Sequence, residues 1–392
     1  MRLDRFITLN LIHPLRRLNG LRADHPRPSD GRGVGDEGSL TQNSILNTHL
    51  PILMYHSISE DPEPGFHPYY RVCTSPQRFR EHMQWLRNNG YQGVCLSAGL
   101  NWLDGKSRKQ NAENRGIKSE VATGHSPIGN RQSIVGDDRG SQSSAFNSKP
   151  VALTFDDGFQ DFYTDAVPIL RECGFNATMY LPTAFIGDTR RRFSPTRTSD
   201  GGGIKGEGLS TLNQPLSTLN SQLSAGRNCL TWNEVKELHA GGIEFGSHTV
   251  NHPRLTELSW PEIQSEIRDS KSDIEQRLGG PCAAFAYPYA FPQANEAFVD
   301  RFKDLLPAVG YKSCVTTQIG RHHSDGDAFQ IKRLPVNSND DSQLFRSKLE
   351  GDYDWLAPLQ SCSKTIKSVL FPKRHAKTTN GLGKRDSIVK HP

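Results

Sequence analysis

The chain has 392 residues, of which 34% are hydrophobic and 23% charged, with a formal net charge of +5. The low apolar fraction predicts one core domain diluted by insertions and tails. The charge is too mild to indicate a nucleic-acid-binding protein. No stretch is long and apolar enough to predict a transmembrane segment or a secretory signal.

The cysteines indicate free thiols. There are seven, an odd number, with no Cys-x-x-Cys pair. Several lie within apolar runs, where a thiol acts as a small hydrophobe. This pattern suits a reducing compartment better than a disulfide framework, so the sequence alone predicts a cytoplasmic location.

The chain begins with a polar segment before the first predicted strand. Residues 1–48 are rich in Arg, Asp, Gly, Pro and Ser and are predicted to be a disordered extension. Order is predicted to start with an apolar strand at 51–57, which contains His56. A helix follows, with Ser75 as its N-cap and Pro76 in its first turn.

Two insertions interrupt the core domain predicted over residues 49–355. The first, at about 104–149, has no apolar period. The second, at about 188–227, is predicted to be of low complexity, although it contains a short duplication at 209–222. Residues 356–392 form a basic tail, for which a solvated segment and a contact with an anionic surface are both open.

Strands and helices alternate between the insertions, which predicts a mostly parallel sheet wrapped by helices, either open or closed into a barrel. Further strands are predicted at 91–96, 151–157, 177–181, 243–246, 283–289, 312–317 and 330–336, and further helices at 159–173, 230–241, 259–279 and 295–306.

One predicted strand ends in two adjacent carboxylates. Val151 begins an apolar run that leads to Asp156, Asp157 and Gly158. A buried strand of a parallel sheet would carry both acids to the carboxyl edge, where α/β enzymes keep their sites. The alternative is a strand followed by an Asp-Gly turn with both acids in solvent.

Two histidines follow a later strand. His248 and His252 are four residues apart, a spacing that lets both imidazoles face one point. Such a pair also arises by chance. If one of the two aspartates opens on the same rim, three protein ligands are present and one position is left for water, as in a catalytic metal site.

These motifs resemble those of the polysaccharide deacetylases, also called the NodB-homology domain or carbohydrate esterase family 4. Residues 154–158 (Thr-Phe-Asp-Asp-Gly) resemble the first motif and 248–253 (His-Thr-Val-Asn-His-Pro) the second. Residues 285–289 (Phe-Ala-Tyr-Pro-Tyr) resemble a variant of the third. Residues 52–56 (Ile-Leu-Met-Tyr-His) resemble the opening strand of the exopolysaccharide-associated branch. The resemblance covers about 51–350 without the insertions.

The resemblance implies a distorted, incomplete (β/α) barrel and a hydrolase that removes N-acetyl groups from a polysaccharide or glycan precursor. It implies a divalent metal, zinc foremost, held by Asp157, His248 and His252. Asp156 is then the general base for a metal-bound water. It further implies that the groove for sugar rings is lined by Tyr287, Pro288 and Tyr289, the last of which also offers a backbone N–H to the oxyanion. Family analogy adds a cell-envelope or secreted location as an alternative.

The chain departs from the family pattern in two places. An arginine that orients the catalytic Asp is usual in the third motif, where this chain has Ala286. Our hypothesis is that Arg333 supplies the guanidinium instead. A histidine that acts as general acid is usual in the late motif, and residues 333–336 contain none. His56 is a candidate for that role, and a structural role is equally open for it.

Two functions therefore remain. A metal-dependent deacetylase explains why Asp156, which is not a predicted metal ligand, lies next to a predicted ligand. A non-catalytic glycan-binding protein that keeps the fold and metal would explain Ala286 and the missing histidine. A zinc peptidase fits less well, because the chain has no His-Glu-x-x-His pair.

Overall fold

The computed structural model describes residues 3–16, 49–61, 71–114, 149–193, 195–197, 204–206 and 226–360. The predicted duplication at 209–222, most of the first insertion and the tail beyond Gln360 lie outside the described residues. Within the described part, the cysteines are free thiols, as predicted. Among the helices of that part, none has both the length and the apolar character that crossing a bilayer requires.

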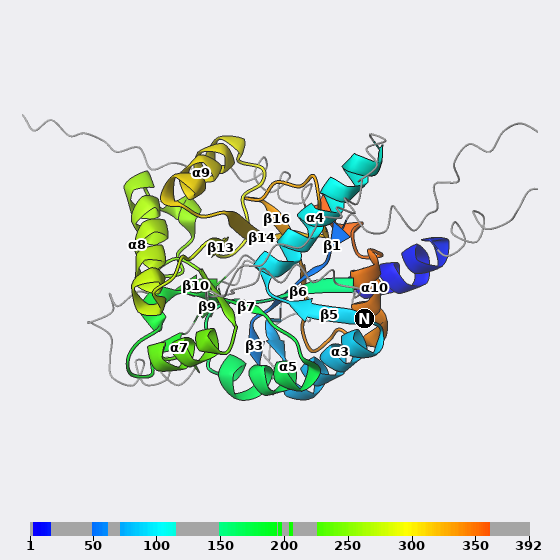
Figure 1. The fold of residues 1–392 in the computed structure, drawn as a ribbon, viewed down its shortest axis with the longest axis horizontal. Coiled ribbons are helices and arrows are strands. Elements are labelled where there is room, and N and C mark those ends of the chain that lie inside the picture. Colours follow the sequence, from blue (N-terminus) through cyan, green and yellow to red (C-terminus); the bar gives the residue numbers. More distant parts are fainter. Residues whose placement is uncertain are drawn as a thin grey trace, which may run out of the picture.

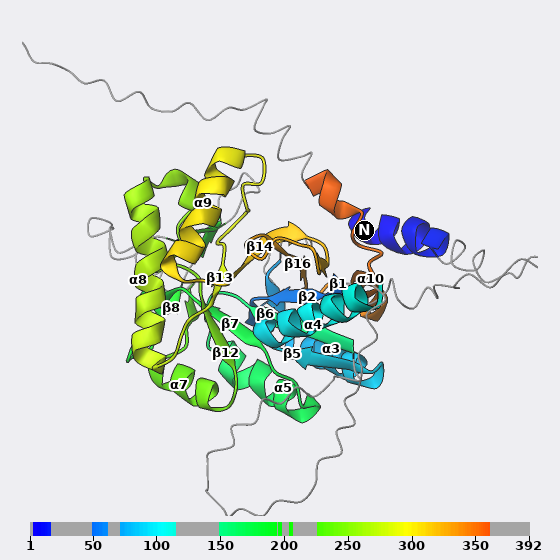
Figure 2. The same cartoon turned by 45° about the horizontal axis from the view of Figure 1, so that its top comes forward.

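Seven parallel strands of the described chain form a closed ring (Figures 1 and 2). In hydrogen-bonding order they are β2 (Ile52–Tyr55), β16 (Ile331–Pro335), β14 (Ser313–Ile319), β13 (Ala284–Ala286), β12 (Glu244–Ser247), β7 (Thr178–Leu181) and β6 (Lys149–Phe155). Pairing of β6 with β2 closes the ring. The strand β5 (Tyr91–Val94) pairs with the first half of β6, and β7 pairs with the second half. The predicted (β/α) barrel is confirmed.

Helices alternate with these strands and surround the ring (Figure 2). The main ones are α3 (Pro76–Asn88), α4 (Leu96–Asn114), η4 (Phe162–Ala166), α5 (Val167–Cys173), α7 (Trp232–Ala240), α8 (Trp260–Leu278), α9 (Glu296–Val309) and α10 (Ser342–Glu350). Short elements complete the fold: α1 (Leu3–Ile7), η1 (Thr8–Ile12), η5 (Thr183–Phe185), η6 (Leu255–Glu257), β1 (His49–Leu50), β3 (Ser57–Ile58), β4 (Cys73–Thr74), β8 (Arg192–Phe193), β9 (Pro195–Arg197), β10 (Ile204–Gly206), β11 (Arg227–Asn228) and β15 (His322–His323).

The helix ends follow the local signals of the sequence. The Ser75 side chain accepts a hydrogen bond from the backbone N–H of Arg78, so the predicted N-cap is confirmed. Ser259 and Glu262 form a capping box at the start of α8. Gly279 ends that helix in the left-handed conformation, which a glycine adopts without steric cost.

Each ring strand buries both of its faces. In β6, every residue from Pro150 to Phe155 is buried. One face of the ring packs against the helices. Because the ring is closed, the other face is its interior, which is filled by Ile52, Ala152, Tyr180, Ala284, Ala286, Val315 and Ile331. Gly246 makes room for the ring of Tyr180, since a Cβ atom there would lie 2.5 Å from it.

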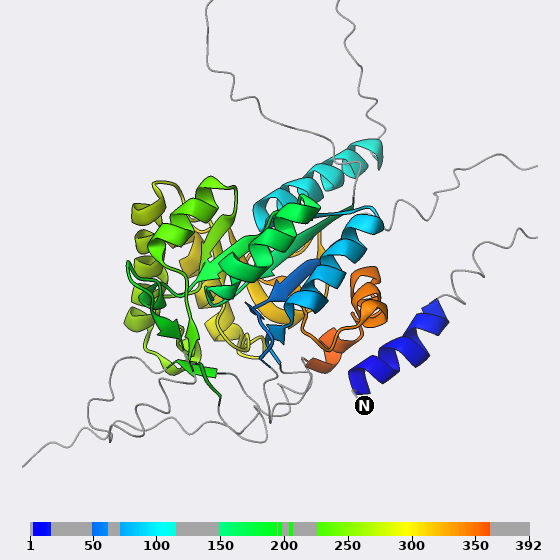
Figure 3. The ribbon, with the colours of Figure 1, turned by 90° about the horizontal axis from the view of Figure 1, so that it is seen from below.

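The prediction of a disordered extension over residues 1–48 is wrong for residues 3–16, which are helical (Figure 3). The Asp4 carboxylate accepts a hydrogen bond from the hydroxyl of Tyr353 at 2.6 Å, and the Thr8 hydroxyl accepts one from the indole N–H of Trp355 at 3.0 Å. These partners lie 349 and 347 residues away in the sequence. Composition does not indicate the helix because tertiary contacts hold it.

Regular structure extends into both predicted insertions, so each insertion is shorter than expected. Helix α4 continues to Asn114, ten residues into the stretch predicted to lie outside the core. The second insertion starts and ends in an antiparallel pair, in which Phe193 of β8 lies opposite Arg227 of β11. The side chain of Phe193 is fully buried, so this part of the insertion belongs to the core.

A buried histidine links α3 to the loop after β16. The Nδ1 atom of His82 lies 3.2 Å from the Tyr55 hydroxyl, and its Nε2 atom lies 2.7 Å from the carbonyl oxygen of Asp340. Its ring stacks on Phe345 with centroids 4.1 Å apart. Burial lowers the pKa of His82 from 6.5 to about 4, so the ring is neutral in the folded protein at pH 7.

We predict that this histidine makes the fold acid-sensitive. Its folded pKa lies below its unfolded value, so between pH 6.5 and about 4 the unfolded chain binds a proton that the folded chain does not. The contribution is therefore complete above pH 6.5 and is lost as the pH falls. Between pH 7 and pH 5, urea unfolding should show that the wild type loses about 2 kcal/mol more stability than His82→Gln. An equal loss of stability in the wild type and in His82→Gln would contradict this. So would a wild-type loss that exceeds the loss in the exposed control His239→Gln by the same amount.

Candidate metal centre and active site

The site residues predicted from the sequence lie at the carboxyl ends of the barrel strands. Asp156 and Asp157 follow β6, His248 follows β12, and Arg333 lies near the end of β16. In a parallel barrel these ends form one rim, which is the usual place of an active site.

Three of these residues converge on one point. The Asp157 Oδ1 atom lies 3.6 Å from Nε2 of His248 and 3.4 Å from Nε2 of His252. The two Nε2 atoms are 3.1 Å apart. All three residues are buried, and their ligand atoms lie within 4.8 Å of one another.

This geometry fits a divalent cation. Ligands at about 2.0–2.1 Å from a tetrahedral zinc ion lie roughly 3.3 Å from each other, close to the separations of these three atoms. One carboxylate and two imidazoles are a zinc-type ligand set that leaves a coordination position open. Burial lowers the pKa of both histidines, which keeps them in the neutral form that binds a cation.

The backbone around the cluster orients the imidazoles. The Nδ1–H of His248 donates to the carbonyl oxygen of Ala286 at 2.8 Å, so its Nε2 carries the free lone pair. The backbone N–H of His252 donates to the hydroxyl of Thr249 at 2.9 Å. The ring of His252 packs between Phe193 and Tyr289, with centroid distances of 5.2 and 4.6 Å.

Backbone strain is concentrated at this cluster. Among the described residues, the non-glycine positions with positive φ are Asp157 (74°), Thr249 (69°), His252 (52°) and Tyr289 (59°). Side chains rarely adopt this conformation, and each case costs on the order of 1–3 kcal/mol. The surrounding fold must hold these four residues in place, which is typical of functional sites.

The neighbouring carboxylate, Asp156, is held by a different partner. The two guanidinium nitrogens Nη1 and Nη2 of Arg333 donate to Oδ1 and Oδ2 of Asp156, each at 2.8 Å. The Nε–H of Arg333 donates to the carbonyl oxygen of Thr316, and Nη1 also donates to the hydroxyl of Thr154. The contact expected between Arg333 and Asp156 is therefore present.

The electrostatics of Asp156 follow from this pair. Burial by itself would raise the pKa of the carboxyl group. The charge of Arg333, together with its hydrogen bonds and the nearby imidazoles of His248 and His56, outweighs burial and holds the pKa well below its usual value. Asp156 is thus a carboxylate at any physiological pH.

His56 directly follows β2 and lies beside Asp156. Its Nε2 atom is 3.9 Å from Oδ2 of Asp156, and 18% of its side chain is exposed. The imidazole is therefore near the carboxylate and also reachable from solvent. This partial exposure argues against a purely structural core role.

The aromatic residues of the third motif divide into two groups. Tyr287 was predicted to line the groove, but this is wrong because it is 2% exposed and packs against Phe291 and Phe302. Pro288 is also buried. Phe285 lies in the core. Tyr289 is half-buried beside His252 and is the member of the motif that borders the cluster.

Two residues at the cluster escaped the sequence analysis. Phe193 packs on His252 from within the predicted low-complexity insertion, where the one usable signal is an aromatic residue after three arginines. The guanidinium carbon of Arg254 lies 4.9 Å from the ring centroid of Tyr289. In the sequence, the only feature that points to Arg254 is its position two residues after His252.

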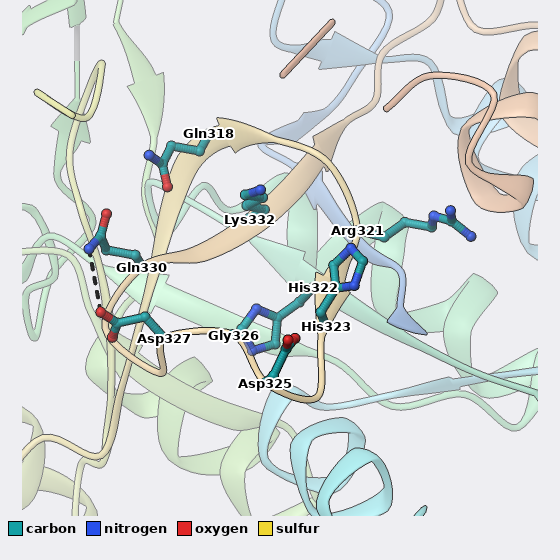
Figure 4. A pocket seen from close by; sticks show the side chains of 9 residues that line it. All are labelled: Gln318, Arg321, His322, His323, Asp325, Gly326, Asp327, Gln330 and Lys332. Carbon is teal, nitrogen blue, oxygen red and sulfur yellow. Dashed lines mark hydrogen bonds between the residues drawn. The ribbon is translucent and has the colours of Figure 1, made fainter. Parts of the chain in front are cut away.

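Other polar groups in the described chain fit a site less well. His13, Glu350 and Asp352 also come close together, but the Arg16 guanidinium donates to Asp352 at 2.9 Å and would repel a cation. A hollow of about 330 Å³ lies around the β14–β16 connection (Figure 4) and shares no residue with the Asp157 cluster. His322 lines it and is 6% exposed.

The fold and site together define a class: a parallel (β/α) barrel with a candidate metal centre on its carboxyl rim and a separate carboxylate beside it. Residues 143–307 match the family model described as polysaccharide deacetylase. The matched segment contains both aspartates, both histidines and Tyr289. The match spans 165 of the 392 residues, so this part of the chain is similar to that family.

The chain is also similar to individual proteins. YxkH of Bacillus subtilis (strain 168), named as a candidate polysaccharide deacetylase, is 24% identical over 301 residues, which cover 77% of this chain and 76% of YxkH. The solved deacetylase PplD of Streptococcus pyogenes, in complex with acetate, is 23% identical and covers 77% of this chain and 98% of its own, with a TM-score of 0.46. A de-N-acetylase from Aggregatibacter actinomycetemcomitans is 18% identical and covers 76% and 99%, with a TM-score of 0.47.

We predict that the full chain binds Zn²⁺ or Co²⁺ at the Asp157 cluster. His252→Ala removes one of three ligands and should weaken binding by at least about 100-fold in calorimetric titration. The matched control is His13→Ala, in the cluster that contains Arg16, and it should leave the affinity unchanged. Loss of binding in the control with retention in His252→Ala would contradict the assignment.

Proposed function

We propose that the protein is a metal-dependent hydrolase that removes N-acetyl groups from a polysaccharide or glycan precursor. One observation carries the proposal: two adjacent carboxylates have different partners. Asp157 faces two imidazoles, whereas Asp156 is bound by Arg333 and stays outside that cluster. A site that only binds has no need for a second, separately held carboxylate beside its ligands.

We assign Asp157, His248 and His252 as the ligands of a divalent cation, with zinc foremost. The fit of the three atoms to a tetrahedral ligand set supports this assignment. Such a cation supplies Lewis acidity, which lowers the pKa of a coordinated water and polarises the acetyl carbonyl.

Asp156 is assigned as the general base. Its pKa is lowered by Arg333, so it is a weak base toward ordinary water and takes a proton only from water that has been made more acidic. Arg333 donates one hydrogen bond to each carboxylate oxygen of Asp156, and a carboxylate can accept about four hydrogen bonds. A proton from the attacking water can therefore still be accepted while Arg333 keeps the group in place.

The remaining steps fall to His56 and Tyr289. As the water oxygen bonds to the acetyl carbon and the carbon–nitrogen bond breaks, the leaving amine must gain a proton. We assign His56 to this step, because it lies 3.9 Å from Asp156 and is partly exposed. By the family resemblance, the backbone N–H of Tyr289 donates to the oxyanion; its left-handed backbone beside His252 supports this role.

We place the protein in the exopolysaccharide-associated branch of the family. The support is the sequence of β2 together with His56, which follows it; residues 52–56 resemble the opening strand of that branch. The alternative function remains a non-catalytic glycan-binding protein. It is favoured by Ala286, which replaces the usual arginine, and by the absence of a histidine from residues 333–336.

We predict that the purified chain releases acetate from an N-acetylglucosamine oligomer when Zn²⁺ or Co²⁺ is present, and that a chelator stops the release. Asp156→Asn should lower the rate by about 10²–10⁴-fold, because it removes the general base. Asp165→Asn, on the adjacent η4 segment, is the matched control and should retain the rate. Oligomer binding without acetate release, unchanged in Asp156→Asn, would favour the glycan-binding alternative.

We predict that Arg333 acts on rate and not on metal content. Arg333→Lys keeps the positive charge but loses the two parallel hydrogen bonds, and should lower acetate release by at least about tenfold with bound metal unchanged. Arg333→Met should lower it further and also cost about 3–5 kcal/mol of stability, since Asp156 would be left as a buried, unpaired charge. Full activity in Arg333→Lys, or metal loss equal to that of His252→Ala, would contradict this role.

A further inference from the structure

The large apolar side chains that are exposed in the described chain gather in one region. They are Phe6, Leu11, Leu15 and Leu359, with exposed fractions between 39 and 57%. The first three lie on the helical segment 3–16, and Leu359 lies in the helical turn at 356–360. Figure 2 shows these two segments side by side at the edge of the barrel. We call the four residues the end patch.

The N-terminal helical segment buries polar side chains and exposes large apolar ones. Asp4 and Thr8 on its inward face are buried and bond with Tyr353 and Trp355. Its outward face carries Phe6 and the two leucines of the end patch. A surface helix normally turns its apolar stripe toward the core, so packing within the described chain does not explain this one.

A strongly basic stretch of sequence follows the end patch. Residues 361–392 contain six lysines and two arginines against a single aspartate. By contrast, the arginines of the helix are already paired, Arg5 with Asp341 and Arg16 with Asp352. In the sequence, a run of uncompensated positive charge therefore begins two residues after Leu359.

We propose that the end patch docks on the surface of an anionic phospholipid bilayer. The apolar side chains would enter the boundary between head groups and acyl chains, while the basic stretch is attracted to the anionic lipids, at about 1 kcal/mol per charge near the surface. Exposed apolar side chains that are followed in the sequence by a basic segment match both layers of such a surface. A second copy of this chain would bring the same positive charge, and the two would repel each other.

The proposal is tested with the full chain and sedimented vesicles. One vesicle set contains phosphatidylglycerol and phosphatidylcholine, and the other phosphatidylcholine alone. The protein should bind the first set, more weakly as salt rises, and should not bind the second. Leu11→Ser combined with Leu15→Ser should weaken binding at least about tenfold, and so should Lys373→Glu combined with Arg374→Glu.

Matched controls separate the end patch from general effects. Asn10→Ser changes an exposed polar residue of the same helix, and Lys236→Glu with Lys312→Glu reverses two exposed charges elsewhere on the barrel. Both should bind like the wild type, and all variants should keep the wild-type melting temperature. None of the variants touches the candidate active site, so acetate release from a soluble oligomer should not change.

Three results would overturn the proposal. The first is failure of the wild-type chain to bind anionic vesicles. The second is binding that the Leu11→Ser, Leu15→Ser variant retains in full. The third is a wild-type oligomer in analytical ultracentrifugation that this variant dissociates, since the end patch would then be an interface between copies. These outcomes are independent of whether the chain is a deacetylase.

Discussion

The buried ion pair between Arg333 and Asp156 is the constraint on which the site depends. The two residues are 1% and 2% exposed, and charged groups so deep in a protein are costly unless they are paired and fully hydrogen-bonded. They are 177 residues apart in the sequence: Arg333 lies on β16 and Asp156 directly follows β6, and these two strands flank β2 in the ring. Closure of the barrel is therefore what makes the pair possible. Without it, Asp156 would be drawn to a cation or would bind a proton.

The short connection after β6 gives two adjacent carboxylates different partners. Successive side chains of a regular strand point to opposite faces. Here the left-handed backbone at Asp157 turns its carboxylate toward the imidazoles, while Asp156 faces Arg333. Gly158 is also left-handed, and a Cβ atom there would lie 2.9 Å from Ile186. The glycine of the motif is thus required by backbone conformation and by close packing.

The segments after β16 hold Arg333 from outside the ring. Lys348 of α10 donates to the carbonyl oxygen of Pro335, at the end of β16, and forms a fully buried ion pair with Asp340 at 2.9 Å. The N-terminal helix in turn packs on residues that follow α10, through Tyr353 and Trp355. A catalytic group such as Asp156 is positioned well only if its partner, Arg333, is itself held rigidly. Both ends of the described chain contribute to this support.

Local patterns determined much of the fold before any tertiary contact was known. Apolar runs marked the ring strands, Ser75 and Ser259 marked helix starts, and the spacing of the acidic and histidine motifs indicated the metal cluster. These features depend on neighbours in the sequence, so the sequence is sufficient to predict them. Only the tertiary structure decided that Tyr287 faces the core, that Phe193 belongs to the site and that residues 3–16 are helical. Tyr287 depends on packing against α9, whereas Phe193 and residues 3–16 depend on partners far along the chain. The closed ring and its surrounding helices bring all of these into contact.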